Sequence, residues 1–142
     1  LLHGFMPGMT MGNVTAVHHV SLLVSDTGRA LAFYRDLLGL AVDASRPELG
    51  YPGAWLVVGA AQIHLLELPD PLRGTPLPEH GGRDRHVALS VTHLDDIQQT
   101  LVSAGVPFTT SRSGRRALFC RDPDGNAIEL VEVAVAGAQD QQ

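Results

Sequence analysis

Hydrophobic residues along the first half of the chain follow strand spacing, then helical spacing, then strand spacing again. Residues 16–24 are rich in Val and Leu and predict a strand. Residues 27–38 place apolar side chains every three or four positions, which predicts a helix with one face on a core. A strand over 40–45 and a hairpin over 54–58 and 61–68 follow. This half therefore predicts the order β-α-β-β-β.

The second half of the chain repeats that order. The pattern predicts a strand over 85–91, a helix over 93–104 and three further strands over 107–111, 115–121 and 126–133. We therefore expect an α+β fold with two βαβββ modules related by internal duplication. Each module should bury one sheet face against its helix. The opposite faces should form a curved mixed sheet around a cleft.

Two short motifs recur in the two halves at nearly constant offset. HVSLLV at 19–24 corresponds to HVALSV at 86–91, and QIHL at 62–65 corresponds to AIEL at 127–130. Because strand side chains alternate between faces, the polar residues of these motifs can share the concave face of the sheet. These residues are His19, His64, His86 and Glu129, all of which are candidate ligands for a divalent metal.

Chain length and composition indicate a single globular domain. The chain has 142 residues, and we expect the domain over 14–133, with module one at 14–68, a Pro- and Gly-rich linker at 69–83 and module two at 84–133. We expect 134–142 to be a flexible tail. Residues 1–13 lack the pattern of a signal peptide and should be a flexible tail or a remnant of cloning.

Charge and cysteine content limit the partners and the compartment. The net charge of −5 gives no indication of a nucleic-acid or membrane partner, and no apolar run is long enough to span a bilayer. Cys120 is the only cysteine, so a disulfide within the chain is excluded. We therefore expect a protein of a reducing, cytoplasmic compartment.

Four segments together resemble one known family. They are 19–26, 31–40 with its ending Leu-Leu-Gly-Leu, 86–91, and 122–130 with Asp-Pro-Asp-Gly before Ile-Glu-Leu. They resemble the vicinal oxygen chelate superfamily, which includes glyoxalase I, bleomycin-resistance proteins and extradiol dioxygenases, and within it the glyoxalase-like branch. The resemblance extends over roughly 14–133.

The resemblance implies a divalent metal between the modules, bound by the first and last strands of each. By position, the ligands are His19, His64, His86 and Glu129, and the ion would be Zn, Ni, Mn or Fe. Glu129 would also be the catalytic base. His64 departs from the family pattern, since bacterial glyoxalase I has a glutamate there and epimerase-like members commonly have a glutamine. This departure argues against a plain glyoxalase I.

Three arginines and the only tryptophan are the candidate substrate-binding residues. Arg46, Arg85 and Arg116 lie near the predicted cleft, where they can bind an anionic group of a substrate or form ordinary surface salt bridges. Trp55 either forms a wall of the pocket or belongs to the core.

These observations predict a metal-dependent enzyme that isomerises, epimerises or cleaves a small metabolite with vicinal oxygens through a metal-stabilised enolate. One alternative is an Fe(II) extradiol-type dioxygenase, although a fourth ligand at His64 would occupy a position that catechol and O₂ need. Another is a drug-binding resistance protein without catalysis. Family members of this size are commonly homodimers. The metal site would then form within one chain or across two copies, and the linker permits both.

Overall fold

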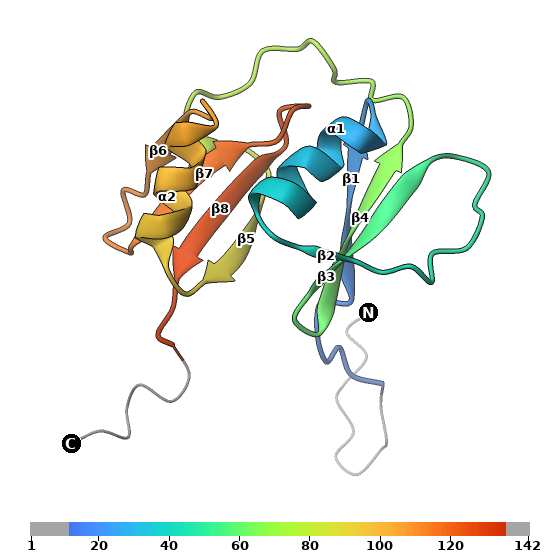
Figure 1. Cartoon of the computed structure of the whole chain (residues 1–142), viewed down its shortest axis with the longest axis horizontal. Coiled ribbons are helices and arrows are strands. Elements are labelled where there is room, and N and C mark those ends of the chain that lie inside the picture. Colours follow the sequence, from blue (N-terminus) through green and yellow to red (C-terminus); the bar gives the residue numbers. More distant parts are fainter. Residues whose placement is uncertain (1–11, 136–142) are drawn as a thin grey trace, which may run out of the picture.

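The computed structural model describes residues 12–135, which form two four-stranded mixed sheets (Figure 1). The predicted tails, apart from 12–13 and 134–135, lie outside the described residues. No helix in the described part of the chain is long and apolar enough to cross a bilayer.

The first sheet has the order β1-β4-β3-β2, with β1 parallel to β4 and the other pairs antiparallel. Its elements are β1 (His19–Val24), α1 (Thr27–Leu31), the π-helical turn η1 (Ala32–Leu37), β2 (Ala41–Val42), β3 (Gly53–Val58) and β4 (Ala61–Glu67).

The second sheet repeats this arrangement as β5-β8-β7-β6. Its elements are the short η2 (Gly81–Arg83), β5 (His86–Val91), α2 (Leu94–Ser103), β6 (Phe108–Thr110), β7 (Ala117–Arg121) and β8 (Ala127–Glu132). The predicted α+β fold of two βαβββ modules is confirmed.

The largest difference from the predicted elements is at β2, which has two residues instead of the six expected over 40–45. Asp43 ends this strand, because its Oδ1 accepts hydrogen bonds from the backbone N and the Oγ of Ser45. β2 and the three-residue β6 are the outer edges of their sheets, whereas the six-residue β1 and β5 are the inner edges.

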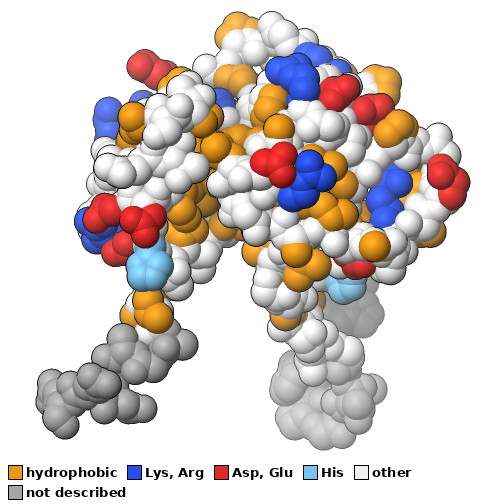
Figure 2. All heavy atoms as spheres, viewed as in Figure 1, with side chains coloured by type: hydrophobic (Ala, Val, Ile, Leu, Met, Phe, Trp, Pro, Cys, Tyr) orange, Lys and Arg blue, Asp and Glu red, His pale blue; other side chains and the backbone are white. Residues whose placement is uncertain are grey.

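One apolar core connects the two modules. α1 packs on β3 and β4, and α2 packs on β8, so each helix covers one face of its own sheet. Tyr34, Leu56, Leu65, Leu118 and Leu130 are almost completely buried within the same cluster. Figure 2 shows apolar side chains gathered in the recess between the modules, with charged side chains spread over the outer surface.

A buried hydrogen-bond network joins the modules at the turn before β8. The Tyr34 hydroxyl donates to Oδ2 of Asp122 at 2.7 Å, and the Asn126 amide donates to the same oxygen at 2.8 Å. Asn126 also donates to the backbone carbonyl of Leu23, at 3.0 Å. Asp122 is 5% exposed, and this burial raises the pKa of its carboxyl although its hydrogen bonds act in the opposite direction.

Replacing Tyr34 with phenylalanine should lower the free energy of unfolding by about 1–3 kcal/mol, because a buried carboxyl loses one of its donors. Urea denaturation measures this change. Tyr51→Phe is the matched control, since the Tyr51 hydroxyl forms no hydrogen bond within residues 12–135, and it should change stability by less than about 0.5 kcal/mol. Equal effects of the two substitutions would contradict the importance of this network.

Candidate metal centre

Three aromatic rings form a stack on the sheet face of module one that is opposite α1. His64 lies in the middle, with its ring centroid 4.5 Å from that of Trp55 and 4.0 Å from that of His19. The ring planes are within 14° of parallel. Strand pairing produces the stack, because Trp55 on β3 is directly opposite His64 on β4, and β1 is the parallel neighbour of β4.

A chain of hydrogen bonds holds the edge of the His64 ring. Its Nε2 lies 2.8 Å from Oε1 of Gln62, and Nε2 of Gln62 donates to Oδ2 of Asp43 at 2.8 Å. Hydrogen bonds from Ser45 and from Gln62 hold the pKa of Asp43 below its usual range. His64 is therefore fixed on both ring faces and along one edge.

Burial within the stack lowers the pKa of His64, and the neighbouring His19 and His18 lower it further. A neutral imidazole at pH 7 is the form that binds metals. His18 precedes β1 and is exposed, and its Nδ1 lies 2.8 Å from Nδ1 of His19.

The second module contains a pair formed by an imidazole and a carboxylate. Nε2 of His86 lies 3.4 Å from Oε2 of Glu129. Nδ1 of His86 lies 2.8 Å from the backbone carbonyl of Asp84, so Nδ1 carries a proton, and in the neutral ring the lone pair is on Nε2, which faces Glu129. The Glu129 side chain is 10% exposed and forms no hydrogen bond to another described residue.

Phe119 borders the second pair, and the end of the linker packs against Phe119. Phe119 on β7 lies opposite Glu129 on β8 and places its ring edge-on to His86, with centroids 5.3 Å apart. A Cβ built on Gly81 would come within 3.1 Å of the Phe119 side chain, so a larger residue at this position would require Phe119 to shift slightly. The end of the linker therefore packs behind Phe119, which borders the pair.

The four predicted ligands lie as two pairs in the single chain. No group of three or more His, Cys, Asp or Glu side chains able to hold a metal ion is found within residues 12–135. Because the His19 and His64 rings are nearly parallel and lone pairs lie in the ring plane, one ring must turn before both can bind the same ion. His19 is exposed and the less restrained of the two.

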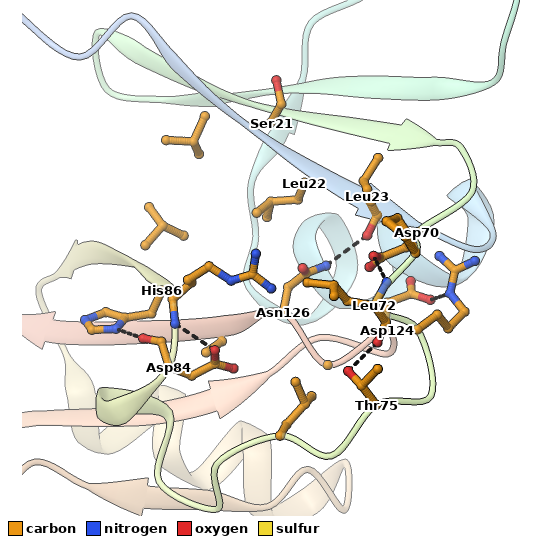
Figure 3. Close-up of a pocket in the computed structure, with 18 of the residues that line it drawn as sticks. Ser21, Leu22, Leu23, Asp70, Leu72, Thr75, Asp84, His86, Asp124 and Asn126 are labelled. Carbon is orange, nitrogen blue, oxygen red and sulfur yellow. Dashed lines mark hydrogen bonds and ion pairs between the residues drawn. The ribbon is translucent and has the colours of Figure 1, made fainter.

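A cavity of about 460 Å³ lies between the modules and is lined by His86 of the second pair. Its walls come from β1, from the linker, from the start of β5 and from the turn before β8 (Figure 3). Arg85 and His86 both line it, and Arg85 forms no salt bridge with another described residue. Figure 3 shows the hydrogen bond between His86 and the Asp84 backbone at one end of the cavity.

Of the other predicted substrate-binding residues, only Trp55 stacks on a candidate ligand. Trp55 is half-buried and contacts His64, so it lies beside the candidate site and outside the buried core. Arg46 donates to the backbone carbonyl of Tyr51 and lies over the Tyr51 ring. Arg116 forms salt bridges with Asp95 and Glu132, both at 2.8 Å, so the structure does not bring it to either pair.

Sequence reasoning missed Gln62, Asp43 and Asp84. Gln62 could have been found, because it lies two residues before His64 and therefore on the same strand face. Asp43 lies just after β2, which β3 separates from β4, and Asp84 contributes only a backbone carbonyl, so neither gives a sequence signal.

The emission of Trp55 should report the protonation of His64. Because the pKa of His64 is lowered, emission should fall with a midpoint below pH ~6.5, the ordinary value for histidine, as the pH is reduced. His64→Ala should abolish this transition, and His19→Ala should move it upward by removing a neighbour that lowers the pKa. A midpoint above that of free histidine would contradict the arrangement. Since the folded state favours neutral His64, its stabilising effect should be lost as the pH falls below about 6.5.

Comparisons with known proteins agree with this architecture. The sequence profile of the Glyoxalase/Bleomycin resistance protein/Dioxygenase superfamily matches residues 16–130. Uncharacterized protein YwkD of Bacillus subtilis (strain 168) is 34% identical over 124 residues, which cover 82% of this chain and 96% of YwkD. Lactoylglutathione lyase of Salmonella typhimurium (strain LT2) is 30% identical over 127 residues, covering 84% of this chain and 93% of the lyase.

The fold is also similar to that of a solved relative. The crystal structure of Lactoylglutathione lyase from Agrobacterium tumefaciens superposes with a TM-score of 0.62 at 23% identity, covering 89% of this chain and 99% of that protein. The two repeated modules and the profile match over most of the chain therefore lead to one conclusion. The chain belongs to the Glyoxalase/Bleomycin resistance protein/Dioxygenase superfamily.

Proposed function

We propose that this protein is a divalent-metal-dependent enzyme of the glyoxalase-like branch, acting on a small metabolite with vicinal oxygens. The reaction would be an isomerisation, an epimerisation or a lyase cleavage that begins with removal of a proton next to a carbonyl. The pairing of His86 with Glu129 carries this proposal. A largely buried carboxylate faces Nε2 of an imidazole, and its other neighbours among the described residues give it no hydrogen bond.

The donor set fits a divalent metal. Three neutral imidazoles and one carboxylate suit Zn, Ni, Mn or Fe, and the separation of 3.4 Å between His86 and Glu129 suits two ligands of one ion. The hydrogen bond from His86 to the Asp84 carbonyl is the kind of outer contact that orients metal-binding histidines. His19 and His64 would be the ligands from module one.

Three residues of the chain would have separate roles in the proposed reaction. When bound, a divalent metal supplies positive charge that polarises vicinal oxygens and stabilises an enolate. Glu129 would accept the proton from the substrate carbon and return it to the same or a neighbouring carbon. Phe119, which lies opposite Glu129 and packs against the end of the linker, would limit access of water to Glu129. Arg85, at the wall of the cavity, would bind an anionic group of the substrate.

The separation of the two pairs supports a homodimeric site. A second copy would bring its His86 and Glu129 to the His19 and His64 of the first, and the two-fold symmetry would create two equivalent sites. This arrangement accounts for a family member whose single chain leaves the four candidate ligands as two pairs.

The protein purified without added metal should contain about one divalent ion per chain, measured by elemental analysis. His86→Ala should weaken metal binding by more than about 100-fold, since removal of a ligand should cost more than loss of an outer contact. Glu129→Gln should lower kcat by about 10²–10⁴-fold, measured with the adduct of methylglyoxal and glutathione and with other vicinal-oxygen substrates.

His93→Ala is the matched control for the histidine substitution, because His93 is exposed and its side chain forms no capping hydrogen bond. It should leave metal content and turnover unchanged. Metal-free wild-type protein, or unchanged metal content in His86→Ala, would overturn the proposal. Oxygen uptake with catechol and Fe²⁺ would favour the dioxygenase alternative, and stoichiometric bleomycin binding without turnover would favour the drug-binding alternative.

Mixing two inactive variants should restore metal binding if the site forms across two copies. His64→Ala and Glu129→Ala each disable every site in their own homodimers. A dimer with one chain of each type has one complete site, so random co-assembly should restore about one quarter of wild-type metal content. Elemental analysis of the co-expressed protein measures this fraction. No restoration, with dimers of mixed composition verified by mass spectrometry, would place all four ligands within one chain.

A further inference from the structure

His64 is the most restrained of the candidate ligands. Trp55 covers one ring face, His19 covers the other, and Gln62 contacts the ring edge at Nε2. The remaining nitrogen, Nδ1, forms no hydrogen bond to a described residue. Which nitrogen of His64 is free to bind a metal therefore depends on which nitrogen carries the proton.

The hydrogen bonds from Asp43 through Gln62 to His64 determine which nitrogen of His64 is protonated. A carboxylate can only accept hydrogen bonds, so the Gln62 atom that contacts Asp43 must be the amide nitrogen. The atom of Gln62 that faces His64 is then its carbonyl oxygen, which is an acceptor. A neutral His64 must therefore donate from Nε2, which leaves the lone pair on Nδ1.

We propose that Asp43 and Gln62 are positioning residues that hold His64 in the tautomer protonated at Nε2, which makes Nδ1 its metal-binding atom. The second half of this statement rests on the proposed function. The first half concerns the metal-free protein and can be tested without any ion.

The two modules would then use different ring nitrogens. His86 donates from Nδ1 to a backbone carbonyl and keeps the lone pair on Nε2, whereas His64 donates from Nε2 to a side chain and keeps the lone pair on Nδ1. The Asp84 backbone carbonyl is always an acceptor, whereas the Gln62 side-chain amide could rotate and present its NH₂ group to His64 instead of its oxygen. The tautomer of His64 consequently depends on Asp43, which fixes the direction of the Gln62 amide.

Long-range proton–nitrogen NMR correlations of the metal-free protein at pH 8 distinguish the two tautomers. The His64 signals, identified by their loss in His64→Ala, should show protonated Nε2 in the wild type. Asp43→Asn frees the Gln62 amide to turn, and Gln62→Leu removes the acceptor. Both should produce a mixture of tautomers and weaken Zn²⁺ binding, measured by calorimetry, by about 10–100-fold.

Gln99→Leu is the matched control, because Gln99 is exposed on α2 and far along the chain from the ring stack. It should change neither the tautomer nor the affinity. Protonated Nδ1 in the wild type, or an unchanged tautomer in Gln62→Leu, would overturn the inference. Absence of Zn²⁺ binding by a wild-type protein that shows the expected tautomer would overturn the proposed function and the ligand role of Nδ1, while the positioning role of Asp43 and Gln62 would stand.

Discussion

The hydrogen bonds at Asp122 fix the relation between the modules on which the rest of the structure depends. Tyr34 donates from the helical segment of module one, and Asn126 connects the carboxyl to the backbone of β1. Burying such a carboxyl is unfavourable unless its acceptors are satisfied, so these donors must arrive together for the domain to close. The contact therefore couples the folding of one module to that of the other, and it sets the cavity between them.

The candidate site follows from the sheets in a different way in each module. In the first, three neighbouring strands place rings of His19, His64 and Trp55 in contact. In the second, Glu129 is buried on its own sheet beside Phe119. The two modules place their candidate ligands at equivalent strand positions, but the residues around those side chains differ. One half offers imidazoles near solvent, and the other offers a buried carboxylate beside an imidazole.

The sequence was sufficient for the order of the elements and for the proximity of the two candidate ligands within each module. Alternation and helical spacing depend on neighbouring residues, so βαβββ and the shared faces of His19 with His64 and of His86 with Glu129 could be predicted. The short β2 could not, because it ends where Asp43 binds Ser45 instead of continuing the ladder. The salt bridges of Arg116 and the role of Gln62 depend on residues from other elements. The separation of the two ligand pairs depends on how whole modules pack, which local spacing does not encode.

The edges of the two sheets carry a further consequence for behaviour in concentrated solution. An exposed strand edge is a template for aggregation, and proteins usually blunt such edges with charge, proline or shortness. β2 and β6 are short, but β1 and β5 have six residues each and contain neither Lys, Arg, Asp, Glu nor proline. These inner edges therefore lack the usual protection against β-sheet extension. Covering the edges of β1 and β5 would protect the chain from aggregation. The strands that carry candidate ligands are therefore also the strands most prone to aggregate when the protein is a monomer.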